Sequence, residues 1–226
     1  MLDLILPCLD EAEALEWVLS RVPPEVNPIV VDNGSVDGSP GLARAFGAQI
    51  IECPTRGYGA ACHAGLEAAS AEVVAFCDCD ASVDPCIVEA FAEPVIAGSA
   101  DLVVARRRAI TWSAWPAHAR AANATLAWQV RRRTGVDIHD IGPLRAAGRE
   151  QLLGLTQLDR RSGYPLETVI LAARAGWRIT QADVAYRPRL GRSKVTGTVR
   201  GTRQAVSDMR AVLARPASVG SAGREA

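Results

Sequence analysis

The stretch VVAFCDCD, residues 73–80, decides the fold of this 226-residue chain. Its first part is apolar, which predicts a strand buried on both faces, and Asp78 and Asp80 follow one residue apart where that strand ends. Hard cations such as Mg²⁺ and Mn²⁺ take oxygen ligands, and Mg²⁺ usually combines one or two protein carboxylates with substrate phosphates. We therefore expect Asp78 and Asp80 to hold a cation that bridges a diphosphate. The alternative is that they solvate a turn while Asp84 caps a helix beginning at Pro85.

Strand and helix patterns alternate on both sides of this stretch. Two intervening segments carry apolar residues at helical spacing, namely Leu15, Val18, Leu19 and Val22, and then Ile87, Val88, Phe91 and Val95. Continuously apolar strands separated by helices indicate an α/β fold with a mostly parallel central sheet flanked by helices. The strands expected in the first half are residues 2–6, 29–32, 49–52, 73–77 and 102–105.

Polar residues follow the first four of these strands. In a parallel sheet, ligands bind beyond the carboxyl ends of the strands, and those ends lie along one edge. We therefore expect a cleft at that edge. The residues that would form it are Pro7, Asp10 and Glu11 after the first strand, 32–35 after the second, 56–59 after the third, and 78–80 after the fourth.

The second half is less regular. Arg106-Arg107-Arg108, three tryptophans (Trp112, Trp115, Trp128) and a second arginine run at 131–133 surround a helix expected from residue 116 to about 132. This cluster fits a membrane interface, and it fits equally a helix packed on the sheet with a basic end. Further along, we expect a helix at 166–175, a strand at 178–186 and a final helix at 198–213.

Composition excludes some classes of function. The chain has 25 Lys and Arg residues and 25 Asp and Glu residues, so no global charge favours nucleic acid as a partner. No basic leader or long apolar segment is present, and we expect a cytoplasmic protein, with a peripheral contact at the inner face of the membrane left open. The six cysteines form no CxxC pair and are expected to be free thiols, although a zinc site of Cys77, Cys79, Cys86 and His63 is conceivable.

Together these clusters resemble the family 2 glycosyltransferases, and most closely the bacterial relatives of polyprenyl-phosphate sugar synthases. The resemblance implies the Rossmann-like nucleotide-diphospho-sugar transferase fold, known as GT-A. It also implies one domain at 1–213, with a nucleotide-sugar-binding half at 1–105 and an acceptor-side half at 106–213. The small, polar residues at 214–226 are expected to form a disordered tail. The segments that carry the resemblance are 7–13, 30–38, 56–61 with Gly65, 78–80, 138–146, 163–167 and 189–198. Cys79 departs from the alanine or glycine that the family more often places between the two aspartates.

The resemblance assigns roles at the donor site. It implies that Asp32 binds the nucleobase, that Pro7 and Glu11 border the nucleotide, and that the turn of Arg56 and Gly57 lets the backbone approach it. Asp78 and Asp80 would hold Mg²⁺ or Mn²⁺ on the donor diphosphate. Three cationic residues, Arg106, Arg192 and Lys194, would clamp the donor diphosphate or an acceptor phosphate.

On the acceptor side, the sequence leaves open both the acceptor and the need for a general base. Inverting transfer to a hydroxyl needs a general base, for which Asp140 and Glu167 are the candidates, whereas a phosphate acceptor is already an anion and needs none. Glu167 fits equally a favourable charge at a helix N-terminus. The hypothesis is thus an inverting, metal-dependent glycosyltransferase that uses a nucleoside-diphosphate sugar, with polyprenyl phosphate or a small hydroxyl compound as acceptor. The alternative is a non-catalytic nucleotide-sugar-binding protein with a regulatory or scaffold role.

Overall fold

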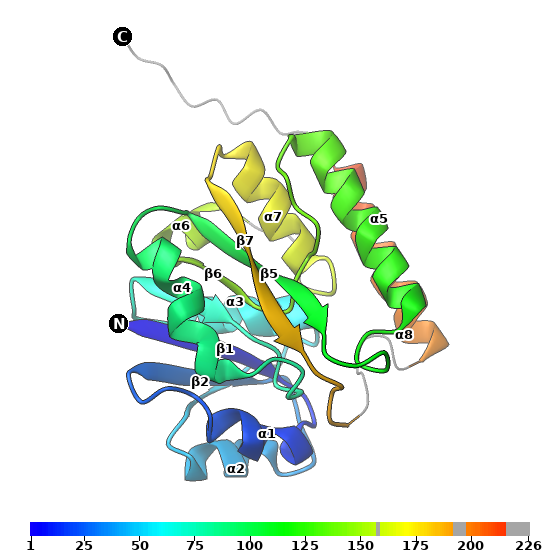
Figure 1. The fold of residues 1–226 in the computed structure, drawn as a ribbon. Helices are drawn as coiled ribbons and strands as arrows, with labels where there is room; N and C mark the ends of the chain where they lie inside the picture. The colour runs from blue at the N-terminus through cyan, green and yellow to red at the C-terminus, as the bar shows by residue number, and fades with distance from the viewer. Residues whose placement is uncertain (157–158, 192–197, 216–226) are drawn as a thin grey trace.

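A computed structural model describes residues 1–156, 159–191 and 198–215. Seven strands form one sheet in the order β3-β2-β1-β4-β6-β5-β7 (Figure 1). Their bounds are β1 (Leu2–Cys8), β2 (Val26–Asp32), β3 (Gln49–Glu52), β4 (Val73–Phe76), β5 (Leu102–Ala109), β6 (Arg145–Gly148) and β7 (Ile179–Tyr186). Strand β1 pairs in parallel with β2 and β4, β2 with β3, and β5 with β7, while β6 runs antiparallel to β4 and β5. The expected mostly parallel sheet is confirmed.

Helices cover both faces of this sheet (Figure 1). They are α1 (Ala12–Leu19), α2 (Ser39–Ala45), α3 (Tyr58–Ala68), α4 (Val88–Ile96), α5 (Ala117–Thr134), α6 (Arg149–Gly154), α7 (Tyr164–Arg174) and α8 (Val199–Ala214), with a short 3-10 helix, η1 (Pro85–Ile87). In the described part of the chain, no helix combines the length and apolar character needed to cross a bilayer.

Two apolar layers hold the sheet between the helices. Because successive side chains of a strand point to opposite faces, Leu4 and Leu6 of β1 pack in the layer of α1, α2 and α4, whereas Ile5 packs in the layer of α3, α6 and α7. All three side chains are fully buried. This double burial is the reason that the strands are apolar at consecutive positions.

The second half differs from expectation at two strands. Strand β5 continues to Ala109 because it pairs with β7 along its whole length, from Leu102 opposite Ile179 to Ala109 opposite Tyr186. The arginine run 106–108 is therefore part of a strand that was expected to end at residue 105. Strand β6, whose sequence is RAAG, was not expected at all because it has no β-branched or aromatic residue. The expected tail largely lies outside the described residues.

Candidate active site

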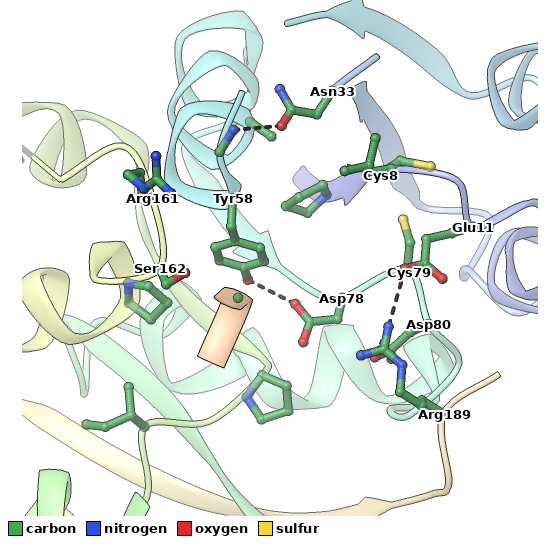
Figure 2. Close-up of a pocket in the computed structure, with 18 of the residues that line it drawn as sticks. Cys8, Glu11, Asn33, Tyr58, Asp78, Cys79, Asp80, Arg161, Ser162 and Arg189 are labelled. Carbon is green, nitrogen blue, oxygen red and sulfur yellow. Dashed lines mark hydrogen bonds and ion pairs between the residues drawn. The ribbon is translucent and has the colours of Figure 1, made fainter. Parts of the chain in front are cut away.

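A cavity of about 500 Å³ lies at the edge where β1, β2 and β4 end, and Figure 2 shows it in close-up. Polar clusters that are far apart in the sequence meet there, as the parallel topology predicts. One side, here called the donor end, carries the ends of β1 and β2 and the 78–80 turn. The other, here called the acceptor end, carries the lining residues from β5 onward, except Arg189, which contacts Glu11 and Asp80 at the donor end. Six residues expected to bind the donor line the cavity: Pro7, Glu11, Arg56, Gly57, Asp78 and Asp80.

Asp78 lies at the centre of the cavity, beneath the ring of Tyr58 (Figure 2). Tyr58 Oη donates a hydrogen bond of 2.9 Å to Asp78 Oδ1, and Arg145 Nη2 donates to the same Tyr58 oxygen at 3.3 Å. Burial raises the pKa of Asp78 to about 6, and the negative charge of Asp80 adds to this rise. Asp78 thus lies in a place where burial and a neighbouring carboxylate disfavour its charged form.

Asp80 ends the same turn. Its Oδ1 accepts a hydrogen bond of 3.0 Å from the backbone N–H of Ser82, and Ala81 between them has a φ of +61°. A positive φ is costly for a residue with a side chain, so the turn is held in a strained form that aims Asp80 into the cavity. The other oxygen, Oδ2, lies 3.3 Å from Arg189 Nη2.

The Asp78–Asp80 pair suits a hard divalent cation in ligand type and in charge, because its carboxylates face one cavity and the pKa of Asp78 is raised. Within the described residues, no group of three or more His, Cys, Asp and Glu side chains could hold a metal ion. A cation at this pair would take its remaining ligands from water or from substrate oxygens. The conceived zinc site is not formed, since Cys77 and Cys79 are buried while Cys86 is exposed.

Asp32 does not line the cavity. Its carboxylate accepts hydrogen bonds from the backbone N–H groups of Gly34 and Ser35, at 3.3 and 3.1 Å, and so stabilises its own turn. Asn33, the next residue, lines the cavity instead. Asn33 Nδ2 donates to the carbonyls of Cys53 and Thr55, and its Oδ1 accepts from Gly57 N–H at 2.8 Å. Asn33 thus fixes the 53–57 segment against the end of β2.

Gly57 has a structural requirement for glycine. Its φ is +145°, and a Cβ atom there would lie 2.2 Å from the carbonyl oxygen of Arg160. The sequence was interpreted as glycine leaving room for a nucleotide; in the structure, the space is taken by the protein's own backbone. Arg56, which also lines the cavity, donates from Nη2 to the carbonyl of Gly34 at 3.3 Å.

Asp140 is almost fully buried and bound to Arg107. Arg107 donates to its carboxylate from the backbone N–H, from Nε and from Nη2, at 2.8, 3.1 and 2.7 Å. Arg107 lines the cavity, whereas Asp140 does not. Asp140 therefore orients Arg107 and is not in a position to take a proton from an acceptor in this cavity.

Glu167, the other expected base, also lies outside the cavity lining. It is 4% exposed, accepts a hydrogen bond of 2.7 Å from the backbone N–H of Asp159, and forms an ion pair with Arg215. These contacts tie the 159–163 segment and the end of α8 to α7. The geometry thus agrees with the structural interpretation of Glu167.

Of the three residues of the expected cationic clamp, the structure describes only Arg106. Arg106 pairs with Asp183 on the neighbouring strand β7 and does not line the cavity, because its side chain points to the opposite face from that of Arg107. Arg192 and Lys194 lie outside the described residues. The cations that do line the cavity, besides Arg56, are Arg107, Arg145, Arg161 and Arg189.

Sequence analysis gave no role to several residues that line the cavity, among them Arg145 and Tyr58, because no local sequence pattern marks them. Arg145 is 2% exposed and sits in the unexpected strand β6, and Tyr58 opens α3. Their one sequence signal was position, since Tyr58 follows Gly57 directly and Arg145 belongs to the 138–146 segment quoted above.

Comparison with known proteins agrees with this geometry. The model of glycosyl transferase family 2 matches residues 3–153. An uncharacterised glycosyltransferase of Mycobacterium tuberculosis is 44% identical over 210 residues, which cover 92% of this chain and 96% of that relative. The dolichyl-phosphate hexose transferase of Haloferax volcanii is 28% identical over 197 residues, 86% of each chain.

Solved structures share the fold. Glucosyl-3-phosphoglycerate synthase from Mycobacterium tuberculosis, in complex with Mn²⁺, UDP and glucosyl-3-phosphoglycerate, superimposes with a TM-score of 0.75 at 23% identity over 96% of this chain and 81% of that one. The same enzyme with Mn²⁺ and UDP-glucose gives 0.75 at 23% identity, over 96% and 80% of the two chains. At this identity the likeness concerns the fold, which is GT-A. The family match and the mycobacterial relative show that this chain is a glycosyltransferase and belongs to glycosyl transferase family 2.

Proposed function

We propose that this glycosyltransferase moves a sugar, with inversion, from a nucleoside-diphosphate sugar to a phosphate oxygen of its acceptor. A divalent cation, Mg²⁺ or Mn²⁺, would be held by Asp78 and Asp80. The observation that carries the proposal is the contrast between the ends of the cavity: among the described residues, paired carboxylates line the donor end, and the acceptor end is lined by arginines and by no carboxylate.

The donor end suits a nucleoside diphosphate. Asp78 and Asp80 would hold the cation, which when bound offsets the charge that develops on the departing diphosphate. Pro7 and the backbone around Asn33 and Gly57 would border the nucleoside. Arg56 would approach the phosphates. Asp32 stays a candidate for the nucleobase if its turn opens toward the ligand.

The acceptor end favours an anion. The carboxylates that line the cavity, among the residues that the structure describes, are Glu11, Asp78 and Asp80, all at the donor end. The segments 157–158 and 192–197 contain no Asp, Glu or His. Among the described residues, transfer to a hydroxyl would therefore find no base that lines this end, whereas a phosphate oxygen is already ionised at neutral pH and needs none.

Arginines would orient such an acceptor. Arg107 and Arg161 line this end, and Arg145 lies behind them with its Nε hydrogen unpaired in the described structure. Ile141, Pro143 and Met209 supply apolar walls beside them. A phosphate attached to an apolar chain, as in a polyprenyl phosphate, matches both features.

The reaction step then balances without a protein base. An acceptor phosphate oxygen attacks the anomeric carbon from the face opposite the diphosphate, and the bond from that carbon to the diphosphate breaks. Its electron pair leaves with the nucleoside diphosphate. The chain's own task is to hold the two phosphate groups on opposite sides of the sugar, as the two ends of the cavity allow.

The test combines a donor screen with a matched acceptor pair. Thermal-shift measurements with Mn²⁺ and UDP-, GDP- or dTDP-sugars would find the donor, and nucleotide release would then be followed with farnesyl phosphate, farnesol and 3-phosphoglycerate. We expect release with farnesyl phosphate and none with farnesol; release with 3-phosphoglycerate alone, which carries a hydroxyl group beside its phosphate, would contradict a phosphate oxygen on an apolar chain as the acceptor. Transfer to farnesol would contradict the acceptor class, and binding of donors without turnover on any acceptor would favour the scaffold alternative.

A peripheral contact with an anionic membrane is the second part of the proposal. Trp112 is 91% exposed and Ile110 52% exposed on the loop between β5 and α5. The helices α5 and α8 carry seven arginines, and their single carboxylate, Asp208, is buried. An exposed indole beside basic helices suits a surface of anionic lipid headgroups.

Co-sedimentation with vesicles would check this contact. We expect binding to vesicles that contain phosphatidylglycerol, weaker binding to phosphatidylcholine alone, and a loss of binding in Trp112→Ser. Phe46, which is 41% exposed after α2, supplies the matched control Phe46→Ser. Equal binding of both variants and the wild type would remove Trp112 from the contact.

A further inference from the structure

Arg189 lies between two carboxylates at the donor end (Figure 2). Its Nη2 is 3.3 Å from Glu11 Oε1 and 3.3 Å from Asp80 Oδ2. Both carboxylate side chains are less than a tenth exposed, and Arg189 Nε is buried without a hydrogen-bond partner in the described structure. The guanidinium of Arg189 thus contacts two buried carboxylates at 3.3 Å each, and its Nε–H donor makes no hydrogen bond in the described structure.

The backbone holds Arg189 at this place. Leu190 N–H donates to the carbonyl of Asp80 at 2.9 Å, and Arg187 N–H donates to the carbonyl of Ser82 at 2.8 Å. The 187–190 segment is therefore fastened along the 80–82 turn on both sides of Arg189. The side chain can leave the carboxylates by rotating about its own bonds while the segment stays in place.

We propose that Arg189 is a built-in competitor of the divalent cation: it neutralises Asp80 and Glu11 in the free protein and must leave them for the cation to bind. This inference rests on the cation site proposed above. A divalent ion needs the lone pairs of Asp80 that face Arg189, and two positive charges at one carboxylate repel each other. The guanidinium therefore weakens cation binding in the absence of a donor.

A nucleoside diphosphate changes this balance. Its phosphate oxygens offer the displaced guanidinium bidentate hydrogen bonds, which arginine makes well because its donors form a planar fork. Cation and nucleotide then favour each other's binding. The nucleotide accepts the guanidinium that the cation displaces, and the cation occupies the carboxylates that the guanidinium leaves when it turns to the nucleotide. The consequence is a site that takes up the cation together with the donor.

Mn²⁺ titration of the purified protein tests the idea without any turnover. The free-ion signal of Mn²⁺ in electron paramagnetic resonance would be followed with Mn²⁺ alone, and again with UDP or GDP present. For Arg189→Gln we expect Mn²⁺ alone to bind roughly tenfold more tightly than to the wild type, and the gain in affinity caused by the nucleotide to shrink by a similar factor. Arg189→Lys, which keeps the charge, should stay close to the wild type.

Arg187→Gln is the matched control, because Arg187 lies on the same segment but its side chain approaches Asp84, at 4.0 Å. It should leave Mn²⁺ affinity unchanged. Thermal unfolding would verify that each variant folds, with Arg189→Met as a second neutral variant. Unchanged or weaker Mn²⁺ binding by folded neutral variants would overturn the competition while leaving the cation site intact. Failure of all proteins to bind Mn²⁺, with or without nucleotide, would instead remove the cation site and the inference with it.

Discussion

At the scale of single residues, the site depends on carboxylates whose neighbours differ. Asp78 and Asp80 line the cavity, and burial together with their mutual repulsion raises the pKa of Asp78 to about 6. Asp140 and Glu167 are instead buried beside arginines, outside the lining. Four carboxylates that look alike in sequence thus divide into two that line the cavity and two that are buried in ion pairs outside it.

Asp80→Asn should abolish transfer and leave the fold intact. The amide oxygen of asparagine can still accept the hydrogen bond from Ser82 N–H, so the turn is kept while the negative charge is lost. We expect the turnover number to fall by roughly a hundredfold or more, and thermal unfolding to change little. Asp84→Asn, on the loop that follows, is the control for turnover alone, because Asp84 does not line the cavity. Full cation-dependent activity of Asp80→Asn would refute the site.

Glu167→Gln should lower stability and leave transfer nearly unchanged. Its carboxylate holds Arg215 and the backbone of Asp159, so loss of the charge should lower the free energy of unfolding by about 1–3 kcal/mol. The turnover number should stay near that of the wild type. Urea unfolding and steady-state kinetics measure the two quantities. A large loss of turnover with unchanged stability would restore Glu167 as a base.

At the scale of elements, the cavity wall is made by a tight junction between α3 and the segment before α7. Gly57 N–H bonds to Asn33, and Gly59 and Ala60 donate backbone hydrogen bonds to the carbonyls of Arg161 and Arg160, at 3.0 and 2.7 Å. The start of α3 is thus connected both to the donor half and to a segment about a hundred residues later. Only glycine at 57 permits so close an approach.

Gly57→Ala should therefore be costly. The new methyl group would meet the carbonyl oxygen of Arg160 in a backbone conformation that side chains disfavour, and we expect a loss of about 2–4 kcal/mol in the free energy of unfolding. Gly41→Ala in α2 is the matched control, since nothing lies within 4 Å of its added Cβ. That change should be neutral or stabilising by up to about 1 kcal/mol. Equal effects in chemical denaturation would show that the junction is not tight.

At the scale of the whole molecule, ion pairs join segments that the sheet brings together. Arg21, which follows α1, donates to Asp84 through Nε and Nη2, the latter at 2.7 Å. Arg187, beyond β7, also approaches Asp84. The loop after β4 is thus connected to the segment that follows α1 and to the segment that follows β7.

This connection predicts a loss of stability in acid. Burial opposes ionisation of Asp84, but hydrogen bonds from Arg21 and Cys86 outweigh it and lower its pKa from 3.8 to about 2. A carboxyl whose pKa is lower in the folded state stabilises the fold above its unfolded pKa, and this contribution disappears as the pH falls from about 4 to 2. Asp84→Asn keeps the capping oxygen but removes the charge, so it should be less stable than the wild type at pH 7 and converge with it near pH 2. Thermal melts across this range check the difference; a constant gap would contradict it.

Much of the fold could be predicted because it depends on local pattern. Apolar runs such as Val73–Cys77 are buried on both faces in any parallel sheet that helices cover, and the chain must leave each strand at the same edge. Because β1 and β4 end at that edge, the strand pattern alone predicts that Asp78 and Asp80 lie near Pro7 and Glu11. Strand β6 escaped prediction because RAAG owes its conformation to pairing with β4 and β5.

The sequence by itself thus determined the α/β class, the family and the position of the paired carboxylates, because side-chain period and strand ends are properties of neighbouring residues. The tertiary structure alone decided which polar residues share a space. It set Arg107 and not Arg106 toward the cavity, turned Asp32 onto its own loop, enclosed Glu167 beside Arg215, and brought Arg189 to Glu11 across 178 positions. Strand register and packing fix the direction and the partner of each side chain, and neither can be read from the pattern of neighbouring residues.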